Sequence, residues 1–189
     1  MFQKLPAFLG KALHGVRAGP GKLLLNEEAA AAPETIRVES GAFADGGAIP
    51  VRFTADGEGV SPPLAWSGLP EATRQVLVVV EDPDIPAPQP FIHLIAVFDA
   101  STTTVGEGQL AEGSGIARFG RHSMGGSGWL PNDPPPGHGP HHYLFQVFAL
   151  DRLLEWDETP GKDEVKAALR DAVIAKGVLV GIYERAGSN

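Results

Sequence analysis

Acid, imidazole and phenol side chains gather at two points of this sequence. His141 and Tyr143 lie two positions apart, at the start of a run that continues to Leu150. Because positions two apart in a β-strand share a face, we expect this imidazole and phenol side by side at the mouth of a strand. Asp82 and Asp84 end an earlier apolar run, and His93 opens the next one. We predict that the two clusters meet in one pocket.

The loop before His141 is dense in proline and glycine, from Asp133 to Pro140, and it includes Pro135. Proline lacks the N–H group and fixes φ, so this segment predicts a stiff, irregular loop rather than a helix or inner strand. Loops that a rigid scaffold holds in place often carry binding groups. The segment 82–90 contains four prolines, and we expect one of its X–Pro bonds to be cis.

Two imidazoles and a phenol supply several hydrogen-bond donors of adjustable protonation, a set that suits a phosphate-like anion. Backbone N–H groups near Gly137 or Gly139 could add to it. An ionised Asp82 would hold one imidazole in a fixed tautomer and favour its charged form. On its own, His93 reads as a buried histidine on the strand face of Ile95 and Val97.

Two other chemistries use the same residues. A metal site could draw on His138, His141 and His142, but adjacent strand residues face opposite ways and no HExxH spacing is present. A hydrolase could use His93 or His141 as the base and Asp82 as its orienting acid. No GxSxG or SxxK nucleophile motif accompanies them. We therefore expect no metal, no cofactor and no catalytic residue.

Composition excludes several classes of protein. The 189 residues are 43% hydrophobic, carry a net charge of -8 and include no cysteine. This length suits one core domain, and the missing cysteines exclude disulfides and thiolate chemistry. The acidic balance argues against a nucleic-acid partner, which needs a basic footprint. No apolar run approaches the roughly 20 residues of a membrane helix, so we expect a cytoplasmic protein.

The first 22 residues differ from the rest, because they contain the cations Lys4, Lys11, Arg17 and Lys22 and no acidic residue. Apolar residues recur in them at helical spacing, namely Phe2, Leu5, Leu9, Ala12 or Leu13, and Val16. The pattern predicts a short amphipathic helix followed by a linker. Such an arm could pack on its own domain or on the second subunit of a homodimer, and the alternative is contact with a membrane surface.

From residue 33 onward the pattern predicts a mainly β domain. Strands are expected at 36–39, 49–54, 75–81, 92–99, 143–150 and 178–183, with Leu64 and Trp66 anchoring an extended segment. The continuously apolar runs 75–81 and 92–99 predict neighbouring central strands. Residues 100–130 are rich in glycine and predict a long excursion with little regular structure. A helix is expected over 163–176, stopped by Gly177.

Taken in order, these motifs resemble one family. The segments are Asp56-Gly57-x-Gly59-x-Ser61-Pro62-Pro63-Leu64-x-Trp66, Asp82-Pro83-Asp84-x-Pro86, His93, Pro134-Pro135-x-Gly137-x-Gly139-x-His141-x-Tyr143, and Gly181-x-Tyr183-x-Arg185. Together they resemble the phosphatidylethanolamine-binding protein (PEBP) family, and most closely its bacterial and archaeal Raf-kinase-inhibitor-like branch. The resemblance covers residues 33–189 as one domain and leaves 1–32 outside it.

The resemblance implies a large antiparallel sheet, a smaller sheet, a C-terminal helix and a small pocket. By motif position, the pocket residues are Asp82, Asp84, His93, Pro135, His141 and Tyr143. Their implied ligand is a phosphate-like anion or a phospholipid head group. Because relatives inhibit protein kinases or serine proteases, the alternative is an interaction protein that acts through its surface. Phe91, Pro131 and Asp133 depart from the family pattern, and the acid at 133 favours a zwitterionic ligand over a plain anion.

Overall fold

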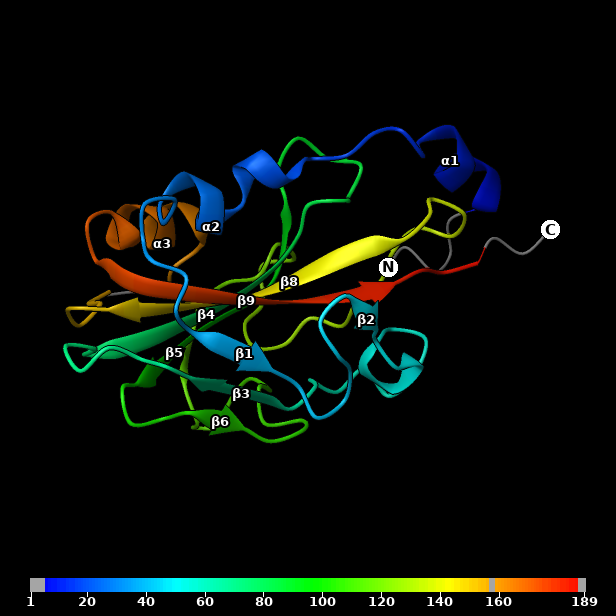
Figure 1. Cartoon of the computed structure of the whole chain (residues 1–189). Helices are drawn as coiled ribbons and strands as arrows, with labels where there is room; N and C mark the ends of the chain where they lie inside the picture. Colours follow the sequence, from blue (N-terminus) through cyan, green and yellow to red (C-terminus); the bar gives the residue numbers. More distant parts are fainter. Residues whose placement is uncertain (1–5, 157–158, 187–189) are drawn as a thin grey trace.

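The structure is a computed structural model, and it describes residues 6–156 and 159–186. Two β-sheets and three short α-helices make up the fold (Figure 1). The strands are β1 (Arg37–Glu39), β2 (Gly47–Ala48), β3 (Leu64–Ser67), β4 (Gln75–Asp82), β5 (Phe91–Asp99), β6 (Thr104–Val105), β7 (Arg118–Phe119), β8 (His141–Leu150) and β9 (Val173–Tyr183). The helices are α1 (Ala7–Ala12), α2 (Leu24–Glu27) and α3 (Lys162–Leu169), with 3-10 turns η2 (Pro20–Lys22) and η3 (Val51–Phe53).

The larger sheet has the strand order β2-β9-β8-β4-β5-β7, and the smaller has β1-β3-β6. All of the pairings are antiparallel except that of β2 with β9. The expected mainly β architecture with two sheets is therefore confirmed. The central strands β4 and β5 are neighbours, as their apolar runs predicted.

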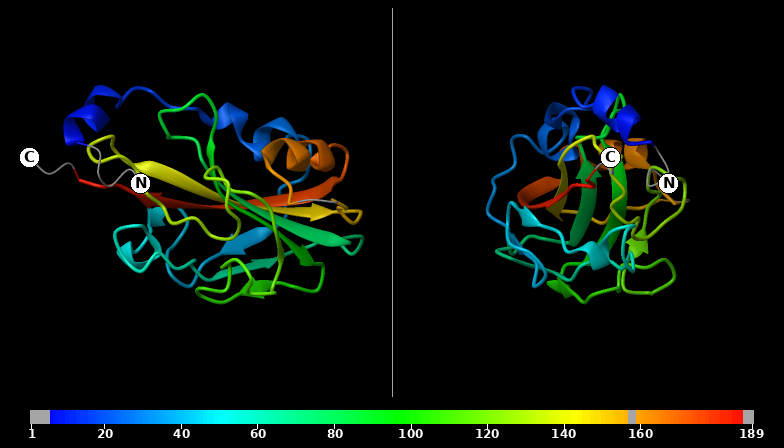
Figure 2. Two further views of the ribbon diagram at one scale, coloured as in Figure 1. Left: turned by 180° about the vertical axis from the view of Figure 1, so that it is seen from behind. Right: turned by 90° about the vertical axis from the view of Figure 1, so that its right-hand side faces the viewer.

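Alternation along the strands divides the core into two layers. Val76, Val78 and Val80 of β4 face the smaller sheet, while Leu77 and Val79 face the opposite side. On that opposite side α2 and α3 cover part of the large sheet (Figure 2). The same alternation holds in β8, where the residues from Tyr143 to Ala149 at odd positions belong to the layer between the sheets.

A β-bulge corrects the position expected for His93. Val80 pairs with Leu94, yet the next residue of β4, Glu81, pairs with Ile92, so β5 contains one extra residue at His93. Such an insertion reverses which face the following side chains occupy. The His93 ring therefore contacts Tyr143 between the sheets. The prediction that it shares a face with Ile95 was wrong, because strict alternation does not survive a bulge.

Two further predictions in the first half of the domain were wrong. The expected strand at 49–54 is replaced by the short strand β2 and the turn η3, since Pro50 interrupts the ladder just before η3. Ile49 and Phe53 are nonetheless buried. Within the fully described segment 82–90 every peptide bond is trans. Residues 100–130 are irregular apart from β6 and β7, as expected.

The late helix ends earlier than predicted. It covers only Lys162–Leu169, and β9 begins at Val173. Asp171 adopts a left-handed conformation with φ of 59°, which reverses the chain between helix and strand. Gly177 lies inside β9, where a Cβ atom would approach the carbonyl oxygen of Ile36 to 2.1 Å. That glycine permits a close crossing of the chain and does not stop a helix.

The N-terminal segment 6–29, here called the arm, lies along the outer face of the large sheet (Figure 1). Leu23 and Leu24 are fully buried in the layer that α3 shares. In contrast, the predicted apolar stripe of the first helix is solvent-exposed: Leu9 is 38%, Leu13 42% and Val16 48% exposed. Phe2 and Leu5 lie outside the described residues. Within 6–156 and 159–186, no helix is long and apolar enough to span a membrane.

Candidate functional site

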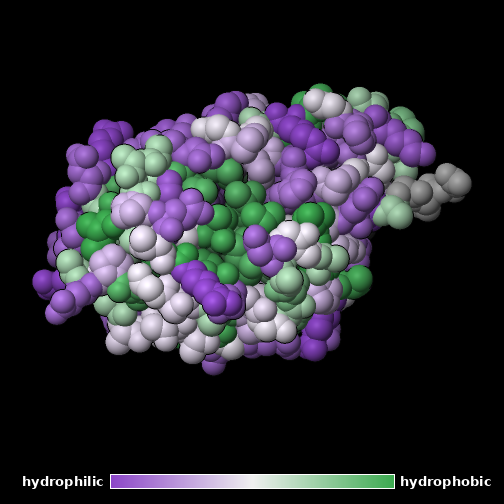
Figure 3. All heavy atoms as spheres, in the orientation of Figure 1, coloured by the Kyte–Doolittle hydropathy of each residue, from purple (hydrophilic) through white to green (hydrophobic). Residues whose placement is uncertain are grey.

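A cavity of about 270 Å³ lies where β4 ends and β5 begins, beside the loop 124–133. Its lining combines apolar side chains with two carboxylates and one imidazole: Ala55, Asp82, Ile85, Phe91, His93, Met124, Leu130, Pro131 and Asp133. A larger open hollow of about 780 Å³ lies along β1 and β9, on the face where hydrophobic residues gather in the middle (Figure 3). Because none of the predicted site residues lines the larger hollow, the smaller cavity is the candidate site.

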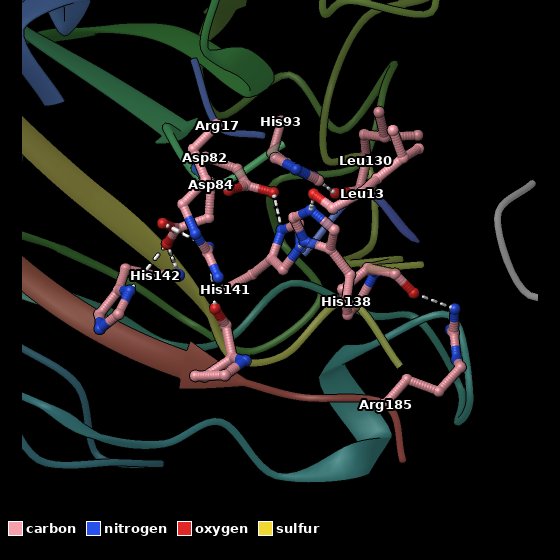
Figure 4. Close-up of polar contacts among 12 residues, drawn as sticks. Leu13, Arg17, Asp82, Asp84, His93, Leu130, His138, His141, His142 and Arg185 are labelled. Carbon is pink, nitrogen blue, oxygen red and sulfur yellow. Dashed lines mark hydrogen bonds and ion pairs between the residues drawn. The ribbon is translucent and has the colours of Figure 1, made fainter. Parts of the chain in front are cut away.

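Asp82 begins a chain of hydrogen bonds that leads away from the cavity (Figure 4). Its Oδ2 lies 2.7 Å from Nδ1 of His141. The Nε2 atom of His141 lies 2.8 Å from Nδ1 of His138, and Nε2 of His138 lies 2.9 Å from the carbonyl oxygen of Leu13 in the arm. Asp82, His138 and His141 are all buried. Both ring nitrogens of His141 are therefore engaged.

Asp84 serves the same loop but faces away from the cavity. Its Oδ2 lies 2.7 Å from Nδ1 of His142 and accepts a bond from the His142 backbone N–H, while its Oδ1 lies 2.6 Å from Arg17. Burial on its own would raise the pKa of Asp84, but the hydrogen bonds from His142 and the charge of Arg17 outweigh it and lower the pKa. Asp84 is thus an ionised anchor for the arm and for the start of β8.

His93 is fixed by two hydrogen bonds to one residue. Its Nδ1 lies 2.9 Å from the carbonyl oxygen of Leu130, and the Leu130 N–H donates to the carbonyl oxygen of His93. Complete burial lowers the pKa of His93, despite an opposing contribution from Asp82. The ring is therefore neutral near pH 7, with the proton on Nδ1 facing Leu130, so Nε2 is an acceptor.

The Tyr143 hydroxyl has no hydrogen-bond partner within the described part of the chain, although the side chain is fully buried. Its ring packs edge to face on His93, with centroids 5.2 Å apart. Burial raises the pKa of Tyr143 well above its usual value, and Asp82 and Asp133 raise it further. Tyr143 is therefore a neutral donor near two carboxylates that line the cavity. A buried hydroxyl without a partner is costly unless water or a ligand meets it.

Arg185 neutralises the second carboxylate of the cavity. Its NH1 lies 2.8 Å from Asp133, and its Nε lies 2.8 Å from Asp56. The remaining nitrogen, NH2, is buried with no hydrogen-bond partner among the described residues. The charge of Asp133, which was expected to disfavour anions, is thus balanced by a guanidinium that has one donor group left.

The predicted site residues come together, but not all of them line the cavity. Asp82 and His93 line it, Tyr143 packs beside His93, and His141 stands behind Asp82. Pro135 is buried in a turn, where its carbonyl oxygen accepts a bond from the His138 N–H. The Gly137 N–H donates to the carbonyl oxygen of Arg185, so it is not available to a ligand.

Sequence reasoning missed several participants. The apolar lining, Arg185 as the partner of Asp133, and the arm residues Leu13 and Arg17 were not predicted. A motif did mark Arg185, but no periodicity connects Leu13 with His138, which lies 125 positions further along the chain. The metal alternative lacks a suitable donor set, since no group of three His, Cys, Asp or Glu residues in the described ranges could hold an ion.

Comparisons with known proteins identify the family. Residues 39–184 match the family model described as phosphatidylethanolamine-binding protein. The chain is 35% identical to a UPF0098 protein of Pyrococcus horikoshii over 150 residues, covering 77% of this chain and 75% of that one. It is 32% identical over 175 residues to a UPF0098 protein of Aquifex aeolicus, covering 87% and 98%.

Solved structures agree with this assignment. The Escherichia coli protein YbcL, described as a member of the mammalian PEBP family, has a TM-score of 0.74 at 28% identity, covering 79% of this chain and 98% of YbcL. The PEBP homolog CT736 of Chlamydia trachomatis has a TM-score of 0.73 at 30% identity, covering 80% and 99%. The chain therefore belongs to the phosphatidylethanolamine-binding protein family.

Proposed function

We propose that this chain is a ligand-binding protein whose cavity takes a small molecule with a phosphate-like group, such as a phospholipid head group. The observation that carries the proposal is the buried Tyr143 hydroxyl, which has no partner among the described residues. The NH2 group of Arg185 is a second donor in the same state. A phosphate oxygen is the kind of acceptor that such donors require, because hydrogen bonds to charged groups are the stronger ones.

The charges around the cavity favour a zwitterion over inorganic phosphate. Asp82 pairs with His141, and Asp133 pairs with Arg185. Each carboxylate is balanced, so the site does not strongly repel an anion, yet both acids remain in reach of an ammonium group. Apolar lining from Ile85, Phe91 and Leu130 leaves room for a short hydrocarbon link. Phosphoethanolamine combines these three features.

The test is a titration with phosphoethanolamine, inorganic phosphate and ethanolamine, followed by NMR of the histidine rings. We expect saturable shifts at His93 with phosphoethanolamine, and binding weakened about tenfold or more in Tyr143→Phe. The chain has one other tyrosine, Tyr183, whose hydroxyl donates to Asp56 at 2.6 Å. Tyr183→Phe is the matched control and should retain binding. Equal binding by Tyr143→Phe and wild type would refute the role of the buried hydroxyl.

A second candidate is an interaction protein, in which the surface acts on a partner such as a kinase or serine protease, or on a second copy of the chain. The observation that favours it is the exposure of Phe8, Leu9, Leu13 and Val16 on the arm, with Phe8 67% exposed. Sedimentation of the wild type and of Phe8→Ser distinguishes the homodimer: association that weakens in the variant supports it. A monomer in both cases removes the homodimer from consideration.

Histidine-assisted hydrolysis gains no support from the geometry. His141 has Asp82 at one ring nitrogen and His138 at the other, so it has no nitrogen left to accept a proton from a substrate. The Nε2 atom of His93 could accept a proton, but no serine or threonine lines the cavity as a nucleophile. Ligand binding is therefore the function that the site supports best.

A further inference from the structure

The hydrogen bonds that run from Asp82 to Leu13 require a definite number of hydrogen atoms. It has three short gaps: Asp82 to His141, His141 to His138, and His138 to the carbonyl oxygen of Leu13, at 2.7, 2.8 and 2.9 Å. Each gap requires one hydrogen, because two acceptors at such distances repel. Two neutral imidazoles supply only two hydrogens. The arrangement is complete only with a third, which makes one histidine an imidazolium or protonates Asp82.

The neighbours of the pair indicate where this proton resides. A carbonyl oxygen can only accept, so Nε2 of His138 carries a hydrogen and its Nδ1 accepts from His141. His141 then carries hydrogens on both nitrogens and forms an ion pair with Asp82. Burial lowers the pKa of His138, and the charge of His141 lowers it further. Both effects agree with a neutral His138 beside a charged His141.

We propose that this third proton fastens the arm to the loop that carries His138, so that docking of the arm is linked to protonation of the histidine pair. In the docked arm the Leu13 carbonyl accepts a hydrogen bond from Nε2 of His138, which leaves Nδ1 of His138 as an acceptor. His141 must then donate from one nitrogen to His138 and from the other to Asp82, so both of its nitrogens carry a hydrogen. When the arm leaves, His138 can turn either nitrogen to solvent, and the demand for the third proton ends. The docked form therefore binds one proton more than the released form.

The arm contacts the domain at several other points, and these contacts do not need the additional proton. Arg17 pairs with Asp84 at 2.6 Å, and the N–H groups of Ala18 and Gly19 donate to the carbonyl oxygens of Ile85 and Pro83 at 3.0 Å. These contacts place the arm against the same 82–86 loop that supplies Asp82 and Ile85 to the cavity. Release of the arm would therefore free one wall of the cavity, which links the proton to ligand access.

Other charged and titratable groups surround the pair. His14 and Arg17 face it from the arm, His93 from β5, Asp82 from the end of β4, and Tyr143 from β8. The His14 ring lies 6.4 Å from that of His138, and Arg17 disfavours a charge on His138. Asp82 is the only one of these groups that forms an ion pair with His141 in the described part of the chain. Its carboxylate is therefore the group that stabilises the proton on His141.

The experiment needs no ligand, so its outcome is independent of the proposed binding function. Long-range proton–nitrogen NMR of the imidazoles at pH 6 should show both nitrogens of His141 protonated, and Nδ1 of His138 bare. Hydrogen exchange at the Ala18 and Gly19 amides, corrected for the intrinsic rate, then reports release of the arm. Between pH 5.5 and 8.5 their protection should fall by up to about tenfold per pH unit, because one proton is lost on release.

Three variants separate the linkage from simple loosening. His138→Phe keeps a ring but removes both nitrogens, so protection should be lower and independent of pH. Arg17→Gln removes an anchor but keeps all three contacts between Asp82 and Leu13, so protection should drop but keep its pH slope. Asp82→Asn removes the negative charge that stabilises protonated His141, so the loss of amide protection should occur at lower pH. A wild-type arm whose protection does not change with pH, or a His138→Phe protein with the wild-type slope, would overturn the proposal.

Discussion

The rings of His93 and Tyr143 meet edge to face, 80° between their planes, in the layer between the two sheets. Both groups are neutral near pH 7, one because burial lowers its pKa and the other because burial raises it. A neutral hydroxyl donor and a neutral imidazole acceptor therefore lie side by side, and the imidazole, His93, lines the cavity. Its charged groups, Asp82 and Asp133, each contact a side chain from outside its lining, His141 and Arg185 respectively.

The lowered pKa of His93 predicts a loss of stability in acid. Below about pH 6.5, His93 binds a proton in the unfolded chain but stays neutral in the folded chain. The free energy of unfolding therefore falls as the pH drops. His93→Asn can still donate to Leu130 but does not titrate. Between pH 8 and 5 we expect wild type to lose about 1 kcal/mol more than the variant, measured by urea unfolding. Equal losses in the two proteins would show that the pKa of His93 is not lowered in the folded protein.

Removing the Tyr143 hydroxyl should not harm the fold. Because this group has no partner in the described structure, Tyr143→Phe should unfold within about 1 kcal/mol of wild type or be more stable. Tyr143→Ala, which deletes the ring from the core, should cost about 4 kcal/mol. Thermal melts of the two variants measure both effects. A large loss in Tyr143→Phe would mean that the hydroxyl has a structural partner, such as an ordered water.

A buried carboxylate should hold the arm and α3 together. Glu81 is fully buried and accepts from Lys162 at 2.9 Å, from the Leu24 N–H at 2.9 Å and from Gln146 at 2.8 Å. Glu81→Gln leaves the Lys162 ammonium without its counter-charge and should destabilise the protein by about 3 kcal/mol in denaturant unfolding.

The control for this variant is an exposed ion pair, that of Arg37 with Glu39, whose side chains are 74% and 54% exposed. Arg37→Gln should leave the unfolding midpoint unchanged, because surface pairs contribute little. Similar losses from the two substitutions would mean that burial does not strengthen the Glu81 network.

Two glycines of the arm offer a matched pair of substitutions. A Cβ atom on Gly10 would lie 2.1 Å from the carbonyl oxygen of Pro136, whereas nothing lies within 4 Å of one on Gly15. Gly10→Ala should therefore lift α1 from the 134–139 loop and raise hydrogen exchange at Leu13 and Val16, while Gly15→Ala should not. Global unfolding should be little changed in both, since α1 contributes one buried residue, Gly10. Unaltered exchange in Gly10→Ala would contradict the docked position of α1.

Much of the fold follows from local pattern. The β-branched runs that became β4 and β5 predicted their own pairing, and alternation in β8 predicted that Tyr143 and Phe145 share a face. The joining of Asp82 with His141 also followed, because both residues stand at strand ends. These features depend on residues close in sequence or on the burial of apolar side chains, which a sequence displays directly.

Other features depend on long-range contacts that leave no local signal. The turn at Asp171 splits one apparent helix into α3 and the start of β9, since pairing of Val173 and Ala175 with β8 outweighs helix propensity. The Leu13 carbonyl reaches His138 only because the arm folds back across the sheet. The bulge at His93 is likewise decided by the neighbours of β5.

Because of the bulge, the chemistry of the cavity depends on the number of residues between the end of β4 and Leu94. Without the extra residue, the imidazole would turn to the side of the sheet where Leu77 and Ile95 pack with the arm and α3. If one residue were deleted from 88–91 and the bulge were lost, His93 would pair with Glu81 in the place of Ile92, and Ile92 would pair with Asp82 in the place of Phe91. The histidine would then lie in a hydrocarbon layer, away from the carbonyl oxygen of Leu130.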